Sequence, residues 1–385
     1  MLLQLVKRLI SSKRPSHRPS TRPRYRPRLE VLEDRRVPVV TFTVDTLGDL
    51  PDANVGDGDA EDVNGDTSLR AAIMEGNATN DSIVINFDPD LYPNNMPVTI
   101  TLGSALPDLA KNFTITGPGS GVLWIQRDTN AQFSFRLLTI TNDTLTCSIQ
   151  GLTLAEGGGS DILYGGAILN DASLTLVDCG FYENQAAYGG AIFNDGTLPA
   201  SACWFVGNVA QGNDARVGDG GAINSVGGTV TLTQGCSFSY NTAARFGGAI
   251  YIGATLVMRD NTQISSYNTA LWGGGIYNVD GNVTMNGGSL AQNQANQAQG
   301  VDDSGRGGGY YGADGSASFT GVNFDTNSAD NRGGGFYVAA GSLTIDTCTI
   351  SGNMCSTGPG GYVQLNVTYN RVNCTVSDII VIETM

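Results

Sequence analysis

Hydrophobic and polar positions alternate in short runs along most of the chain. Residues 173–177 and 341–345 show the pattern clearly, with an apolar side chain at every second position. A period of two is typical of strands with one buried face. The runs are too closely spaced for helical crossovers between them, and this favours strands that turn directly into one another.

A recurring motif marks the turns between these strands. An aromatic or aliphatic residue (once a serine) stands three positions before an asparagine, and a glycine pair and an apolar residue follow. The interval from each apolar residue to the next asparagine is 16 to 18 residues, whereas the interval from asparagine to apolar residue varies from 8 to 17. Such confinement of insertions to one loop per repeat is typical of a solenoid. The asparagines are Asn184, Asn208, Asn241, Asn268, Asn293, Asn327 and Asn353, and two clear glycine pairs are Gly189-Gly190 and Gly247-Gly248.

The predicted fold is therefore all-β, a single right-handed parallel β-helix with coils of about 25 residues. Asparagine and glycine suit tight turns because they tolerate left-handed φ, and stacked asparagines can hydrogen bond along the stack. We interpret these residues as structural, with a ligand-binding role as the alternative. The repeats, over residues 152–365, resemble those of the polymorphic outer-membrane proteins of chlamydiae, and this resemblance implies a surface adhesin.

A short helix is predicted at residues 67–75, before the repeats. Asp66 or Thr67 would cap it, and Gly76-Asn77 would end it. Leu69, Ala72, Ile73 and Gly76 would face the open end of the solenoid, which needs a cover for its strand edges. Residues 41–125 resemble the Cys-Ser-Leu-Arg-Glu-Ala module of bacterial surface proteins, and this likeness implies a secreted architecture.

The first 39 residues form a separate basic tail. Residues 1–40 hold 11 of the 21 Lys and Arg but 3 of the 36 Asp and Glu, so their net charge is +8 and that of the remainder is −23. The Arg/Pro-rich sequence predicts disorder. Residues 29–36, LEVLEDRR, resemble a motif near the N-terminus of planctomycete extracytoplasmic proteins, which implies export; contact with nucleic acid or anionic lipid is the alternative. We predict three segments: the tail at 1–39, a cap with the first coils at 40–125, and repeats at 126–385.

The acidic body limits the partners and cofactors. The negative charge argues against nucleic acid as a partner, because its phosphates attract clustered Lys and Arg. The sequence contains no run of 18 apolar residues, so it predicts no transmembrane helix. An acidic loop could hold calcium at a non-standard site, because it lacks the glycine and glutamate spacing of an EF-hand; a solvated loop is the alternative. No other cofactor is expected. The calcium candidates are Asp57, Asp59, Asp62 and Asp66.

Three cysteines fall in successive coils, five residues before a repeat asparagine. Cys179, Cys203 and Cys236 should point into the core, either as buried thiols or as disulfide partners. The sequence leaves this choice open. Zinc is not favoured, because the chain's one histidine, His17, lies in the basic tail.

The catalytic candidates are few, and they lie in the two longest loops. Asp302 and Asp303, with Arg306, could form an acid pair. Asp214, Arg216 and Asp219 occupy the other long loop and could lie on the same face. We expect a non-enzymatic extracellular or cell-surface protein of structural or adhesive type, which binds glycans or proteins through this loop-bearing face. The alternative is a polysaccharide lyase or glycoside hydrolase of the β-helix type.

Overall fold

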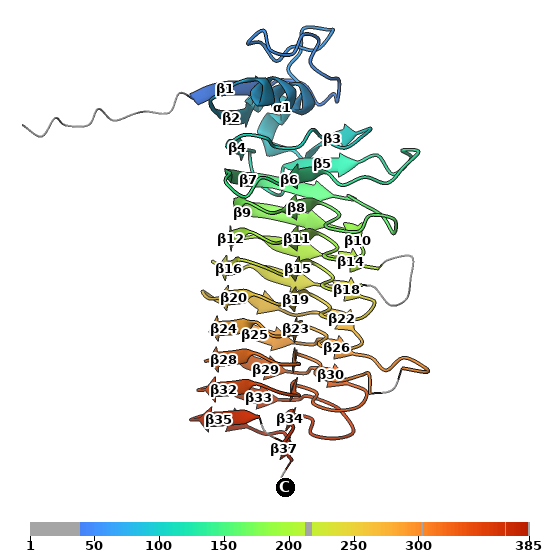
Figure 1. Cartoon of the computed structure of the whole chain (residues 1–385), viewed down its shortest axis with the longest axis vertical. Helices are drawn as coiled ribbons and strands as arrows, with labels where there is room; N and C mark the ends of the chain where they lie inside the picture. Colours follow the sequence, from blue (N-terminus) through green and yellow to red (C-terminus); the bar gives the residue numbers. More distant parts are fainter. Residues whose placement is uncertain (1–38, 212–217, 302, 366, 384–385) are drawn as a thin grey trace, which may run out of the picture. The chain divides into compact units, whose positions relative to one another are not determined.

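The computed structural model describes residues 39–211, 218–301, 303–365 and 367–383. It confirms the predicted class: parallel strands stack coil upon coil into a β-helix (Figure 1). The motif at 29–36, His17, Asp214, Arg216 and Asp302 lie outside the described residues.

Three sheets form the walls of the solenoid. Sheet A has 21 strands, sheet B has 6 and sheet C has 10, and every strand pairing is parallel. Sheet A contains two columns of strands, because most coils bend in the middle of this wall. Only β7 and β9, with 10 residues each, run through both columns.

The strand bounds follow these columns. The first column of sheet A contains β1 (Val39–Val44), β2 (Ser82–Phe87), β4 (Phe113–Thr116), β7 (Thr146–Ala155), β9 (Ser173–Tyr182), β12 (Thr197–Ser201), β16 (Thr229–Thr233), β20 (Thr255–Met258), β24 (Asn282–Asn286), β28 (Ser316–Thr320), β32 (Ser342–Asp346) and β35 (Thr368–Val372). The second adds β3 (Val98–Leu102), β5 (Leu123–Arg127), β13 (Trp204–Val206), β17 (Ser237–Ser239), β21 (Gln263–Ile264), β25 (Ser289–Ala291), β29 (Asn323–Asp325), β33 (Thr349–Ser351) and β36 (Thr375–Val376). Sheet B contains β10 (Gln185–Ala186), β14 (Val209–Ala210), β18 (Thr242–Ala243), β22 (Thr269–Ala270), β26 (Gln294–Ala295) and β30 (Ser328–Ala329). Sheet C contains β6 (Leu138–Ile140), β8 (Ile168–Asn170), β11 (Ile192–Asn194), β15 (Ile223–Ser225), β19 (Ile250–Ile252), β23 (Ile276–Asn278), β27 (Tyr310–Gly312), β31 (Phe336–Val338), β34 (Gly361–Val363) and β37 (Ile380–Ile382).

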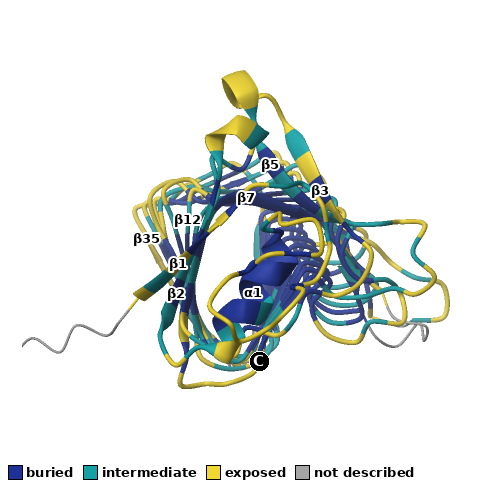
Figure 2. Cartoon of the chain, turned by 90° about the horizontal axis from the view of Figure 1, so that it is seen from above, coloured by how far each residue is buried: buried dark blue, intermediate teal, exposed yellow. Residues whose placement is uncertain are grey.

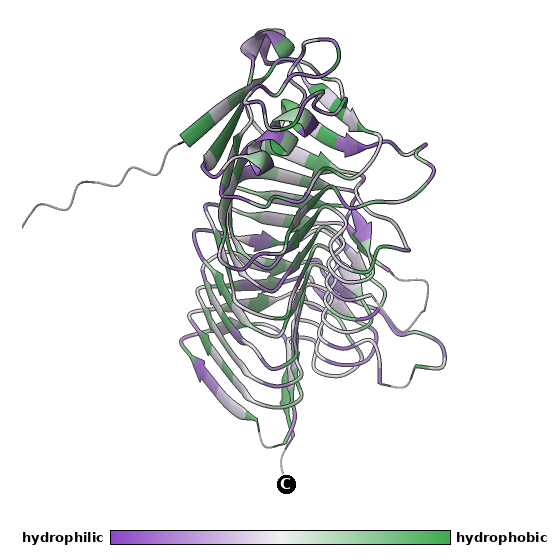
Figure 3. Cartoon of the chain, turned by 45° about the horizontal axis from the view of Figure 1, so that its top comes forward, coloured by the Kyte–Doolittle hydropathy of each residue, from purple (hydrophilic) through white to green (hydrophobic). Residues whose placement is uncertain are grey.

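The core is a continuous rod of stacked side chains. Phe181, Phe205 and Phe238 occupy one position in successive coils, and their rings stack at 4.6 and 4.5 Å. Figure 3 shows hydrophobic residues recurring at the same place from coil to coil. Period-two alternation thus places one apolar set inside, where in-register pairing lines it up.

The N-terminal end is covered by α1 (Leu69–Ala78), which lies across the opening of the solenoid in Figure 2. The predicted helix is present, but its boundaries were wrong. Ser68, not Asp66 or Thr67, is the N-cap, and its Oγ accepts a hydrogen bond from Ala71 N at 3.0 Å. Gly76 lies within the helix. A Cβ at this position would stand 3.0 Å from the Phe113 ring. It therefore allows close packing on the first coil rather than ending the helix.

The cap also contains two short 3-10 turns, η1 (Pro89–Leu91) and η2 (Pro93–Asn95). The predicted segments 40–125 and 126–385 meet within β5, which runs from Leu123 to Arg127. None of the helices among the described residues is both long and apolar enough to cross a membrane.

Candidate functional site

The seven repeat asparagines form a ladder inside the solenoid. The Nδ2 of each of the first six donates to the Oδ1 of the asparagine in the next coil, for example from Asn208 to Asn241 at 2.9 Å and from Asn241 to Asn268 at 2.9 Å. The Nδ2 of the last, Asn353, donates to Asp378 Oδ2 at 2.9 Å. A second hydrogen bond from each Nδ2 reaches a backbone carbonyl, such as Phe205 O at 3.0 Å for Asn241. These side chains are buried and saturated with partners, so they act in the fold and present nothing to a ligand.

The turn chemistry differs from the expectation in one respect. The left-handed residue is the one before each asparagine, for example Glu183 with φ 50° and Tyr240 with φ 58°. The first glycine of a pair is left-handed, as at Gly247 with φ 66°. The second lets two coils approach, because a Cβ on Gly248 would lie 2.1 Å from Gly274 O. The asparagines themselves serve through hydrogen bonding.

The outer face of sheet C carries two parallel columns of side chains. The outer column contains the middle residue of each strand, which follows the apolar residue of the repeat motif or its equivalent. The flanking column contains the residue directly before each glycine turn. Both are aligned by strand and bridge pairing. The outer column runs Leu169, Phe193, Asn224, Tyr251, Tyr277, Tyr311, Tyr337 and Tyr362, and the flanking column runs Tyr164, Tyr188, Asp219, Phe246, Trp272, Arg306 and Arg332.

In the described C-terminal coils this face offers no opening between its side chains. The rings of Tyr277, Tyr311, Tyr337 and Tyr362 stack at 4.9 to 5.4 Å, and all four are buried. The flanking arginines cover them: the Arg306 guanidinium lies 5.1 Å from the Tyr337 ring, and that of Arg332 lies 5.0 Å from the Tyr362 ring.

One coil interrupts both columns. Asn224 and Asp219 replace the aromatic residues there, and a groove of about 430 Å³ results. Aromatic side chains of the coils on either side wall it, and a polar floor lies between them. The lining residues are Tyr164, Tyr188, Phe193, Asp219, Asn224, Val226, Arg245 and Tyr251.

The polar floor is held in place by an ion pair. Arg245 donates to both carboxylate oxygens of Asp219, at 2.8 and 2.5 Å, and lies over the Phe246 ring at 4.4 Å. Burial raises the pKa of Asp219, and the Arg245 guanidinium opposes this. The pair cancels its own charge, so the groove offers polar atoms without a net charge.

Asn224 supplies the unsatisfied group. It is 1% exposed, and its Nδ2 donates to Asp219 O at 3.2 Å. Its Oδ1 is buried without a hydrogen-bond partner among the described residues. A buried acceptor without a donor is destabilising, so a ligand hydroxyl that reached it would be favoured.

The two long loops begin at equivalent strands. They follow β14 and β26, which are separated by β18 and β22 in the strand order of sheet B, and each precedes a strand of sheet C, β15 or β27. Asp219, at the end of the first, is 3% exposed and belongs to the groove. Asp303, in the second, keeps an exposed side chain and forms an ion pair with Arg306, whose Nη1 also donates to Tyr337 Oη at 3.1 Å. Arg306 is therefore part of the aromatic cover.

The calcium candidates do not converge. Asp57 accepts from Asn54 Nδ2 at 2.8 Å and from Asp59 N at 3.0 Å, while Asp62 accepts from Asn64 N at 2.7 Å. These contacts shape turns within the acidic loop. Among the residues that the structure describes, no group of three or more His, Cys, Asp or Glu side chains could hold a metal ion.

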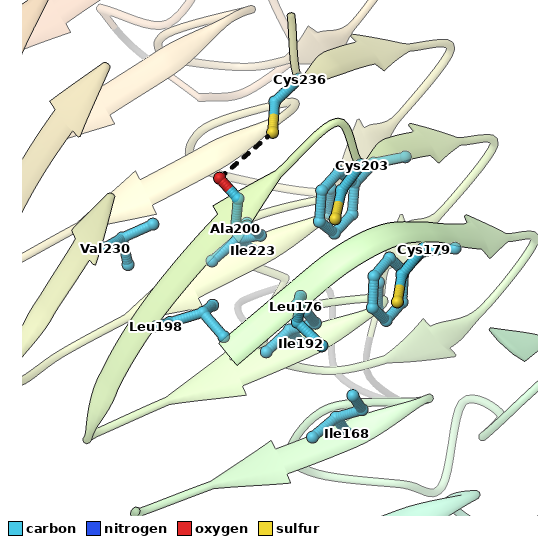
Figure 4. Packing of buried hydrophobic residues seen from close by; sticks show 14 of the residues in the cluster. Ile168, Leu176, Cys179, Ile192, Leu198, Ala200, Cys203, Ile223, Val230 and Cys236 are labelled. Carbon is cyan, nitrogen blue, oxygen red and sulfur yellow. Dashed lines mark hydrogen bonds between the residues drawn. The ribbon is translucent and has the colours of Figure 1, made fainter. Parts of the chain in front are cut away.

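The cysteine ladder is present as free thiols. Cys179, Cys203 and Cys236 follow one another in successive coils and point into the core (Figure 4). Each is at most 1% exposed. Burial and the neighbouring thiols raise the pKa of Cys203 and of Cys236, so these sulfurs stay protonated and act as small apolar groups.

A second surface cluster lies on the outside of sheet A. Trp124 lies 5.6 Å from Tyr182 and 6.1 Å from Trp204, measured between ring centroids. Glu156 and Glu183 stand one above the other beside it, since Glu156 N donates to Tyr182 O. Burial and the Glu183 carboxylate raise the pKa of Glu156. Neither this cluster nor the groove was predicted from the sequence.

Comparisons with known proteins add nothing to this picture. The chain matches no family model, no curated protein and no solved structure.

Proposed function

We propose that this chain is a non-enzymatic, extracellular or cell-surface solenoid that binds a glycan in the groove on sheet C. The observation that carries the proposal is the one-coil interruption, at Asn224 and Asp219, of two columns that are aromatic or cationic in most coils. Concave sites with apolar walls and a few fixed polar groups are typical of small-molecule binding.

The chemistry of the groove suits an uncharged sugar ring. The Tyr188, Phe193 and Tyr251 rings offer apolar faces on which a pyranose can stack. Asp219 and Arg245 offer an acceptor and donors for hydroxyl groups, and Asn224 Oδ1 needs a donor. Because the ion pair is internally neutral and the body of the chain is acidic, we expect neutral glycans to bind more tightly than uronic-acid polymers.

Several features support display outside the cell. The LEVLEDRR motif, the likeness to secreted β-helix modules and the acidic body all fit that location. A protein partner on the same face is the other outcome, because exposed aromatic residues also mark protein interfaces.

The test uses the purified full-length chain and immobilised neutral and acidic polysaccharides, each with calcium and with chelator. Retention on a neutral glycan supports the proposal. Tyr251→Ala should reduce retention at least about tenfold, which corresponds to about 1.4 kcal/mol. The matched control is Tyr267→Ala, which removes an exposed tyrosine stacked on Tyr240 away from sheet C. Equal loss in both variants, or retention only on acidic polymers, would contradict the proposal.

A second candidate function, glycan hydrolysis, is favoured by the paired Glu156 and Glu183 beside Trp124, Tyr182 and Trp204. Two carboxyl groups next to aromatic rings, one of them with a raised pKa, are the components of a glycosidase site. The same incubation tests this function by chain shortening. Shortening that disappears in both Glu156→Gln and Glu183→Gln would replace the binding function with an enzymatic one.

A further inference from the structure

Cys348 and Cys374 occupy equivalent positions in successive coils at the C-terminal end of the described structure. The next residues, Thr349 and Thr375, pair in register between β33 and β36. The preceding residues, Thr347 and Asn373, are both left-handed, with φ 52° and 50°. The two cysteines therefore leave the same kind of turn in the same direction.

Their sulfur contacts repeat in the same way. Cys348 Sγ donates to Asp346 O at 3.4 Å and to Phe319 O, in the preceding coil, at 3.4 Å. Cys374 Sγ donates to Val372 O at 3.2 Å and to Ile345 O at 3.5 Å. Each thiol thus bonds the carbonyl two residues before it and one carbonyl of the coil above, so the two side chains lie one over the other.

The backbone already has the separation that a disulfide needs. Residues paired in adjacent parallel strands lie about 4.8 Å apart, and disulfide-linked Cα atoms lie about 4.4 to 6.8 Å apart. A cross-link would require rotation of the side chains and no movement of the coils.

Access distinguishes this pair from the other cysteines in register. Cys179, Cys203 and Cys236 are enclosed by coils on both sides. Cys374 is half-buried, and β36 pairs within the described residues with β33 alone. A small oxidant can therefore approach Cys374, whereas the three-cysteine ladder is closed to it.

We propose that Cys348 and Cys374 form a disulfide in an oxidising compartment and fasten the last described coil to the one before it. A low-molecular-weight disulfide supplies the oxidation. The Cys374 thiolate attacks it, the oxidant's S–S bond breaks, and one thiol leaves after taking up a proton. Cys348 then loses its proton and attacks Cys374 Sγ, and the second thiol leaves. Two cysteine thiols are oxidised, and one disulfide is reduced to two thiols.

The order of attack follows from burial. Burial and the nearby Cys374 raise the pKa of Cys348 to about 11, so Cys374, the more exposed thiol, reacts first. The coil that the bond would fasten is weakly protected, because most residues of β35 are exposed. The bond would restrict the opening of this coil.

The experiment incubates the full-length chain with reduced and oxidised glutathione, alkylates the free thiols and maps the peptides by mass spectrometry. We expect a cross-linked peptide pair containing Cys348 and Cys374, with Cys179, Cys203 and Cys236 alkylated only after unfolding. Hydrogen exchange of the β35, β36 and β37 amides should slow at least about tenfold on oxidation. The control variant Cys355→Ser removes a half-buried thiol and should preserve both results, whereas Cys374→Ser should abolish them.

The wild-type peptide map decides the matter even if Cys374→Ser folds poorly. Alkylation of both cysteines after oxidation, a stable glutathione adduct on Cys374, or a cross-link from Cys374 to another cysteine would each overturn the proposal. Glycan binding by the groove does not enter this measurement, so its outcome is independent of the proposed function.

Discussion

Two columns of side chains follow the solenoid axis, and they differ in continuity. The asparagine ladder runs unbroken from Asn184 to Asn353, and its amide nitrogens all donate to partners. The outer column of sheet C holds aromatic rings above and below Asn224, where it is interrupted. The internal column repeats the same residue because leaving the polar atoms of a buried amide without partners is costly, and an asparagine in each coil satisfies those of its neighbour. The external column has no such constraint, and its interruption opens a groove.

The comparison teaches how to separate structural from functional repeats in this protein. A residue that recurs in every coil and is saturated with internal partners supports the stack. A coil that departs from its neighbours at the surface, and leaves the Asn224 carbonyl oxygen without a partner, is the place to look for a ligand.

Breaking the ladder should have the largest effect on stability. Asn241→Ala removes the side-chain donor to Asn268 Oδ1 and to Phe205 O. It also removes the acceptor of Asn208 N and one of the two acceptors of Asn208 Nδ2, which keeps its hydrogen bond to Phe181 O. We expect the free energy of unfolding to fall by about 3–5 kcal/mol, measured by denaturant titration. Asn296→Ala, at an exposed asparagine outside the ladder, should change stability by less than about 0.5 kcal/mol. Similar effects in the two variants would show that the ladder is not the stabilising column.

Separating the coils should have the next largest effect. In Gly248→Ala the new methyl group would meet Gly274 O at 2.1 Å and Thr269 N at 2.5 Å. Because backbone atoms of the next coil must shift, we expect a loss of about 2–3 kcal/mol in the same titration. The control is Gly121→Ala, where no heavy atom lies within 4 Å. If Gly248→Ala were as stable as this control, close approach of the coils would not explain the glycine pair.

Filling the interruption should alter binding and leave stability nearly unchanged. Asn224→Tyr would continue the column between Phe193 and Tyr251 and occupy the groove. We expect glycan affinity to fall at least about tenfold, or about 1.4 kcal/mol, in a titration of the retained glycan. The melting temperature should stay within a few degrees of the original, which distinguishes a filled groove from a damaged fold. Undiminished binding would place the glycan elsewhere.

The smallest effect should come from the cap, where a buried carboxyl also has an unpartnered atom. Asp52 is 7% exposed, and its Oδ2 has no hydrogen bond among the described residues. Burial raises the pKa of Asp52, and Glu75 raises it further. A pKa raised in the folded state means that the folded chain binds the proton more tightly. The corresponding stability is complete below the unfolded pKa of about 3.9 and is lost as the pH rises through the folded value.

Asp52→Asn should remove this dependence and stabilise the chain at pH 7 by about 1 kcal/mol. Denaturant titrations between pH 3 and pH 7 measure both effects. A pH profile that Asp52→Asn leaves unchanged would exclude Asp52 as its source.

The repeat motif allowed the stacked coils to be predicted, and the capping and apolar residues at 66–77 allowed the covering helix to be predicted. The helix boundary at Ser68 was missed because Asp66, Thr67 and Ser68 are all good caps, and the choice depends on where the chain meets the first coil. The burial of Arg70 and Glu75 was also missed. Arg70 binds Asp49, and Glu75 accepts from Gly58 N at 2.7 Å, so loop residues 17 to 21 positions away satisfy charges that the sequence suggests are exposed.

The groove had a signal in the sequence that went unread. The residue after the apolar residue of each repeat motif, or after its equivalent, is aromatic in most coils. An asparagine stands there once, at Asn224. Asp219 was noted only as a member of a long loop. Reading the position before each glycine pair as a column would have placed it beside Asn224.

The sequence by itself determined the parallel coil, because strand alternation, asparagine turns and glycine pairs are local patterns that each repeat carries in full. Only the tertiary structure decided which surface is closed and which is open. Tyr164 and Tyr251 wall one groove although 87 positions separate them. Their meeting depends on the stacking of four coils and on whether Arg245 or a tyrosine fills the space between, and no single repeat specifies that.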